Sequence, residues 1–80
     1  MSKKILFFSS ETCNPCNQVK KLLSKEIIKE LNIVFYSAED DFEIFVENEV
    51  KSVPTFISKV NNIEKNRAHG FKTIKELKNL

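Results

Sequence analysis

The sequence has 80 residues, of which 41% are hydrophobic, and its 13 Lys and Arg against 11 Asp and Glu give a net charge of +2. This length fits one domain, residues 1–80, with a core of minimal size. Charges of both signs are interspersed without a long basic block, which argues against nucleic-acid binding. The apolar run at residues 5–8 is too short for a signal peptide or a membrane span. We therefore expect a soluble, cytoplasmic monomer that binds neither nucleic acid nor membrane.

The first half of the chain predicts a strand, a helix and a second strand. Residues 4–9 are short, Phe-rich and apolar without interruption, which is typical of a strand covered on both faces. Residues 14–31 carry an apolar stripe at helical spacing, and Pro15 suits the first turn. Asn32 ends this helix, and the β-branched and aromatic residues 33–36 form the next strand. The stripe consists of Cys16, Val19, Leu23 and Ile27.

The second half predicts a short helix, a hairpin and a last helix. Residues 40–48 form a helix with acidic residues in its first turn and with Phe42, Phe45 and Val46 on one face. Strands at 55–60 and 63–69 flank an Asn-Asn turn, and the polar second strand suits an exposed edge. Thr73 can cap the last helix, whose apolar side chains point inward; these are Ile74, Leu77 and Leu80.

The resulting order is β-α-β-α-β-β-α, an α/β class. A helix joins the first two strands, so these should run parallel, whereas the hairpin makes the last two antiparallel. We expect a four-stranded mixed sheet with helices on both faces, because this arrangement buries the most apolar surface.

The only two cysteines stand three residues apart, in Cys13-Asn14-Pro15-Cys16. In a reducing compartment such a pair is redox-active or metal-binding more often than structural. At the helix N-cap, Cys13 would meet unpaired backbone N–H groups and the positive end of the helix dipole, which lower the pKa of a thiol. Cys16 lies on the core-facing stripe. We therefore expect Cys13 to attack as the nucleophile and Cys16 to resolve the mixed disulfide.

Two other interpretations of the cysteine pair stay open at this point. The pair could form half of a zinc site, but zinc takes four ligands and the chain adds only His69 to the two thiols. The pair could also be inert core cysteines, since free Cys is often buried. We expect no bound metal or cofactor, only a redox-active Cys13–Cys16 disulfide.

The chain has a strand followed by Cys-x-Pro-Cys at a helix start, and it has Val53-Pro54-Thr55 at the entry to a later strand. With this order of motifs it resembles the thioredoxin superfamily over nearly its whole length. The resemblance implies a cis Val53–Pro54 bond packed against the dithiol, with the Val53 backbone pairing with substrate. It also implies substrate contacts from Asn14 and Pro15 and from the loop at Gly70 and Phe71. On the residues alone, Pro54 could be a trans strand-entry proline, and Gly70 a plain turn glycine.

Length and element order are similar to those of a glutaredoxin, but the residues around the site differ. Glutaredoxins commonly carry a Lys where this chain has Ser10, and an acidic residue where it has Lys72. The thioredoxin pattern is incomplete as well. Thr12 replaces the usual Trp, and Phe7 replaces the buried Asp that assists proton transfer.

The resemblance implies a protein disulfide oxidoreductase that works by dithiol–disulfide exchange. Its partners would be protein disulfides, such as that of a ribonucleotide reductase, and a thioredoxin-reductase-type or glutathione reducing system. Two alternatives are a glutathione-dependent glutaredoxin and a non-enzymatic module, either a redox switch or a dimer that holds an iron–sulfur cluster through Cys13.

Overall fold

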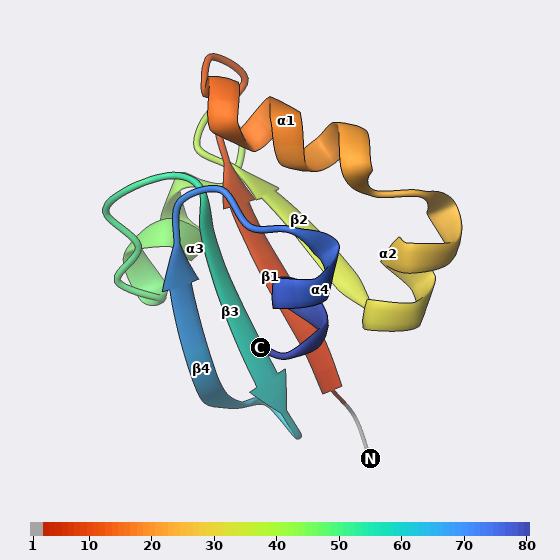
Figure 1. The fold of residues 1–80 in the computed structure, drawn as a ribbon. Helices are drawn as coiled ribbons and strands as arrows, with labels where there is room; N and C mark the ends of the chain where they lie inside the picture. Colours follow the sequence, from red (N-terminus) through yellow and green to blue (C-terminus); the bar gives the residue numbers. More distant parts are fainter. Residues whose placement is uncertain (1–2) are drawn as a thin grey trace.

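A four-stranded mixed sheet with helices on both faces forms the fold, as the sequence predicted. The computed structural model describes residues 3–80. The strands follow the order β2-β1-β3-β4, in which β1 pairs parallel with β2 and antiparallel with β3 (Figure 1). In chain order the elements are β1 (Lys3–Ser9), α1 (Asn14–Leu22), α2 (Lys25–Leu31), β2 (Ile33–Ser37), α3 (Phe42–Glu47), β3 (Thr55–Val60), β4 (Ile63–His69) and α4 (Ile74–Lys78).

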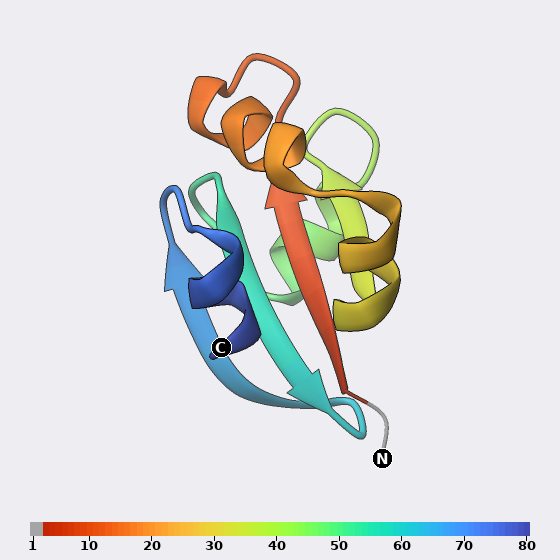
Figure 2. The same ribbon diagram turned by 45° about the vertical axis from the view of Figure 1, so that its right-hand side comes forward.

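Strand β1 lies at the centre of the core, because residues 5–9 are all buried. Successive side chains of a strand point to opposite faces of the sheet. Accordingly, Ile5 and Phe7 pack toward α1, α2 and α4, whereas Leu6 and Phe8 pack toward α3. Figure 2 shows α1, α2 and α4 on one face and α3 behind the sheet. The predicted strand with two covered faces is confirmed.

The single helix predicted over residues 14–31 is wrong: the structure has two helices. Leu23 has an extended backbone at the end of α1, and Ser24 begins α2 as its N-cap. The Ser24 hydroxyl accepts a hydrogen bond from the backbone N–H of Ile27 at 3.2 Å. This bond satisfies an amide that would otherwise lack a partner at a helix start. The apolar stripe continues through the break, so periodicity alone did not reveal it.

Phe42, Phe45 and Val46 fall on one face of α3, as predicted, but only one of them is buried. Phe45 is buried and its ring meets Phe8 edge-on, with centroids 5.0 Å apart. Such a pair contributes about 0.5–1.5 kcal/mol beyond the burial of its area. Phe42 and Val46, however, are 66% and 60% exposed. The helix has only six residues and is anchored through Phe45, so its other apolar side chains reach past the core.

The hairpin agrees with the prediction, and so do Leu77 and Leu80 of the last segment, whereas Ile74 is half-buried and lies outside the core clusters. Asn61 and Asn62 turn the chain with positive φ angles of 53° and 67°, and the edge strand β4 is largely exposed. Thr73 caps α4 in a capping box with Glu76, and Leu77 is buried. Among residues 3–80 no helix is long and apolar enough to cross a membrane.

Candidate functional site

A disulfide joins Cys13 and Cys16 at the amino end of α1, with their Cα atoms 5.2 Å apart. Cys13 is the N-cap, and its Sγ accepts a hydrogen bond from the backbone N–H of Cys16 at 3.2 Å. Pro15 stands in the first turn, where the missing N–H breaks no helical bond. Cys16 is 0% exposed, whereas Cys13 is partly exposed and Asn14 and Pro15 are exposed. The two sulfur atoms therefore have different surroundings, as expected from the sequence.

Apolar side chains surround the buried side of the disulfide. Phe7 is fully buried in the same cluster as Cys16, with Cys13 packed against it. The buried polar residues within the described range 3–80 are Ser9, Thr55 and Ser58, none of which is a carboxylic acid. A thiol at Cys16 would therefore have to exchange its proton with solvent or with a bound substrate.

The loop before β3 contributes Val53 and Pro54 to the same region. The Val53–Pro54 peptide bond is cis, and Pro54 is buried. Val53 packs against the cluster that contains Cys16 and also against the cluster on the other face of the sheet. Val53 and Cys13 thus pack against the same buried cluster, which contains Cys16, although 40 positions separate Val53 from Cys13 in the sequence.

Two hydrogen bonds tie this loop to the end of β4. Gly70 donates its backbone N–H to the carbonyl oxygen of Pro54 at 2.9 Å. The Thr55 hydroxyl donates to the carbonyl oxygen of Ser52 at 2.7 Å and also contacts His69 Nδ1 at 3.0 Å. Because the hydroxyl has one proton, His69 Nδ1 is the donor in the second contact. The sequence missed this role of His69, since the strand register that pairs it with Thr55 is not encoded locally.

Gly70 and Phe71 directly follow β4 and lie beside the loop that carries Pro54. Gly70 has a φ of +83°, which favours glycine. A Cβ atom there would meet nothing within 4 Å, so backbone conformation rather than space makes glycine suitable. Phe71 is 41% exposed, as expected, and Lys72 Nζ donates to the carbonyl oxygen of His69 at 2.8 Å.

Glu39 tethers the loop that precedes Cys13. The Ser10 hydroxyl donates to one carboxylate oxygen of Glu39 at 2.7 Å, and the Glu11 backbone N–H donates to the other at 3.3 Å. These bonds, first of all the one from Ser10, hold the pKa of Glu39 below its usual value. The position where a glutaredoxin commonly carries a Lys is thus occupied by a hydroxyl bound to an anion. No sequence signal marked this contact, which spans 29 residues.

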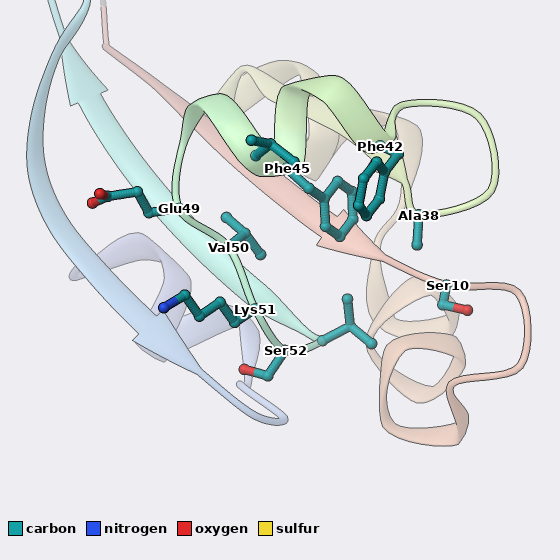
Figure 3. Close-up of a pocket in the computed structure, with 10 residues that line it drawn as sticks. Ser10, Ala38, Phe42, Phe45, Glu49, Val50, Lys51 and Ser52 are labelled. Atoms are coloured by element: carbon teal, nitrogen blue, oxygen red, sulfur yellow. The ribbon is translucent and has the colours of Figure 1, made fainter.

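A pocket with a volume of about 660 Å³ lies on the α3 side of the sheet, and Figure 3 shows the residues that line it. Phe42 and Phe45 point from α3 toward the loop that carries Val50, Lys51 and Ser52. Ser10 and Val53, the residues at the edge of the cysteine site, also line it. Its full lining is Ser10, Ala38, Phe42, Phe45, Val46, Glu49, Val50, Lys51, Ser52 and Val53. The sequence predicted that Phe42 and Val46 share a helix face with Phe45, but it did not predict that this face lines a pocket.

Within residues 3–80, no three or more His, Cys, Asp or Glu side chains lie close enough together to hold a metal ion. The cysteine pair therefore has no further protein ligand beside it in the described part of the chain. The arrangement suits sulfur exchange: one accessible sulfur at a helix amino end, one shielded sulfur and an apolar surface around them.

Comparison with solved structures identifies the fold. The chain superposes on thioredoxin of Fasciola hepatica with a TM-score of 0.81 and 22% identity, covering 96% of this chain and 76% of that one. Thioredoxin 1 of Thermosipho africanus gives a TM-score of 0.79 and 23% identity, over 95% of this chain and 86% of that one. A structure described as a malarial protein gives a TM-score of 0.84 and 18% identity, covering 99% of this chain and 92% of that one. No protein-family model and no curated protein sequence matches.

These identities are low, so the likeness concerns the fold. The chain accordingly has the thioredoxin fold, with a Cys-x-x-Cys disulfide at the amino end of α1.

Proposed function

We propose that the protein reduces protein disulfides by dithiol–disulfide exchange through Cys13 and Cys16. One observation supports this proposal most: Cys13 Sγ lies at the helix N-cap and accepts the N–H of Cys16, while Cys16 itself is fully buried. The hydrogen bond and the helix dipole favour a thiolate at Cys13 once the disulfide is reduced. Burial favours the neutral thiol at Cys16.

In the first step, the Cys13 thiolate attacks one sulfur of the substrate disulfide. The substrate S–S bond breaks, and its second sulfur leaves with the electron pair and takes a proton from solvent. Cys16 then loses its proton and attacks Cys13 Sγ. This attack forms the Cys13–Cys16 disulfide and releases the first substrate sulfur as a thiol. The substrate gains two electrons, and the protein dithiol loses two.

The residues around the dithiol would orient the substrate chain. The backbone of Val53, which precedes the buried Pro54, would pair with the chain of a bound peptide. Gly70, Phe71, Asn14 and Pro15 would form the remaining wall of this site. The exposed ring of Phe71 offers apolar contact area to a partner.

The surroundings favour a protein disulfide over glutathione as the substrate. A glutathione carboxylate needs a cation, but the Ser10 position faces the carboxylate of Glu39. Lys72, where an acidic residue would bind the glutathione amine, donates to backbone carbonyls instead. By the resemblance, a thioredoxin-reductase-type enzyme would return electrons to the protein, and a ribonucleotide reductase or a similar enzyme would receive them.

Reduction of the insulin disulfides tests the proposal. The pre-reduced protein should precipitate the insulin B chain, and Cys13→Ser should abolish this activity because no attacking thiolate remains. Activity that survives in Cys13→Ser, or no activity in the parent protein, would remove the proposal. Recycling by reduced glutathione alone, with a glutathione adduct on Cys13, would support the glutaredoxin alternative. Iron and colour after anaerobic purification would support the cluster-binding alternative.

A further inference from the structure

The pocket beside α3 is an apolar surface that adjoins the proposed exchange site. Phe42 and Val46 are 66% and 60% exposed, among the large hydrophobic residues most open to solvent in the described chain. Phe45 and Val50, both buried, form its floor. Exposed apolar surface gathered in one hollow marks an interaction site more often than a scattered single residue does.

The pocket reaches the cysteine site at two residues. Ser10 follows β1 in the loop that leads to Cys13, and Val53 precedes the cis Pro54. In Figure 3, Ser10 lies at one end of the pocket, and Lys51 and Glu49 lie toward the other. A peptide that leaves the cysteine site past Val53 would therefore enter the pocket directly.

The segment that builds this side of the molecule is strongly acidic. Residues 39–49 contain six of the eleven acidic residues of the chain and none of its thirteen Lys and Arg residues. This segment is the exception to the mixed order of charges in the rest of the chain. Glu43 and Glu47 of α3 are exposed and form no ion pair with any residue in the range 3–80. Such a field attracts a positively charged partner and repels an acidic one.

We infer that this pocket, the α3 groove, binds the chain of a disulfide partner that carries an apolar side chain and Lys or Arg residues next to its reactive cysteine. The apolar side chain lies against Phe42 and Val46, which line the groove. The basic residues lie toward Glu43 and Glu47, which follow these two residues in α3 and stand outside the groove lining, whose own charges are those of Glu49 and Lys51. This inference rests on the proposed function, because the bound chain is that of a disulfide substrate or reductase.

The test uses four synthetic peptides, each with one cysteine and each supplied as its symmetrical disulfide, so that both sulfurs carry the same chain. The cysteine is flanked by Leu or Ser, and by Lys or Glu, in all four combinations. Single-turnover reduction by the pre-reduced protein is measured against peptide concentration. A small uncharged disulfide, bis(2-hydroxyethyl) disulfide, reports the exchange chemistry without the groove.

The Leu–Lys peptide should reach its half-maximal rate at a concentration about tenfold lower than the Ser–Glu peptide. The double variant Phe42→Ser/Val46→Ser should abolish the preference for Leu, and Glu43→Gln/Glu47→Gln should abolish the preference for Lys. Neither should change the rate with the small disulfide. Ile63→Ser, which removes an equally exposed apolar side chain at the far hairpin, is the matched control and should change nothing.

If all four peptides reach their half-maximal rates at the same concentration while the small disulfide is reduced normally, the groove inference is overturned and the proposed function stays intact. Loss of the preference in Ile63→Ser would overturn it as well. A parent protein that dimerises through Phe42 and Val46, without any peptide preference, would assign the surface to a second copy instead. No reduction of any disulfide would remove the proposed function itself.

Discussion

Cys13 and Cys16 have the same side chain but different positions relative to α1. Cys13 Sγ accepts a backbone N–H at the N-cap, whereas Cys16 is enclosed by the apolar cluster around Phe7. A charged sulfur is favoured in the first position and disfavoured in the second. The proposed division of roles between attack and resolution rests on this difference.

The pKa of the Cys13 thiol should lie below the value of about 8.5 found for free cysteine. The physical cause is the hydrogen bond from the Cys16 N–H together with the helix dipole. The measurement is thiolate ultraviolet absorbance against pH in Cys16→Ser, which leaves Cys13 as the only thiol in the chain. A pKa at or above the free value would contradict this description of the N-cap.

The positions of some site residues could be predicted from the sequence, but the contacts of others could not. The cysteine spacing and Pro15 were enough to place Cys13 at the N-cap and Cys16 in the core. The contacts Ser10–Glu39 and Thr55–His69 were missed, because each joins residues 29 or 14 positions apart. Only the sheet register and the loop paths bring these side chains together.

Among the helices and strands, the break between α1 and α2 contradicts the prediction, and the exposure of Phe42 and Val46 on α3 was not predicted. Ser24 is not part of the apolar stripe, and serine is a favoured N-cap residue. This N-cap signal was overlooked because Leu23 and Ile27 keep the regular helical spacing on either side of it. In α3, Phe42 and Phe45 lie three residues apart and share a helix face. The helix is too short for both to reach the sheet, so only Phe45 is buried.

Substitution of Ser24 tests the break directly, because the expected sign differs between the two arrangements. As the N-cap of α2, Ser24→Ala should lower the free energy of unfolding by about 1 kcal/mol. In one continuous helix, the same substitution would raise it slightly, because Ala is the better helix former. Urea unfolding of the oxidised protein measures the change, and stabilisation would contradict the two-helix structure.

The capping box of α4 makes stability depend on pH. Glu76 accepts hydrogen bonds from the Thr73 backbone N–H at 2.9 Å and from its hydroxyl at 3.1 Å. These bonds lower the pKa of Glu76 from its ordinary value of 4.5. A carboxylate with a lowered pKa in the folded state stabilises fully above its unfolded pKa, and the effect disappears as the pH falls through the folded value.

The difference in unfolding free energy between the parent protein and Glu76→Gln should therefore be largest near neutral pH. It should shrink as the pH falls below 4.5, the ordinary value for this carboxyl group. Urea titrations at a series of pH values measure this difference. If the difference in unfolding free energy does not change with pH, the charge of the Glu76 carboxylate contributes nothing to stability.

At the scale of the whole molecule, the sheet order β2-β1-β3-β4 puts the two most buried strands in the centre. Residues 5–9 of β1 and 55–58 of β3 are buried, whereas β4 is mostly exposed. The fold class could be predicted from sequence, because alternation of strands and helices leaves few arrangements that bury every apolar run. The α3 groove could not, because it depends on how far a short helix extends past the sheet.

Backbone hydrogen exchange should reproduce this layering. Amides in the centre of β1 and β3 should exchange slowest, since opening them requires most of the core to open. Amides in β4 and α3 should exchange faster, because these elements bury fewer side chains. Protection in β4 equal to that in β1 would contradict the layering.

The most direct test of the central claim, that Cys13 attacks and Cys16 resolves, is to trap the mixed disulfide. Without Cys16, the intermediate cannot be resolved and should accumulate. Mass spectrometry of the pre-reduced Cys16→Ser variant after mixing with a peptide disulfide should show one peptide bound, and digestion should locate it on Cys13. The matched Cys13→Ser variant should carry little or no peptide, because Cys16 is buried. Equal adducts on both variants, or an adduct on Cys16 alone, would contradict the account.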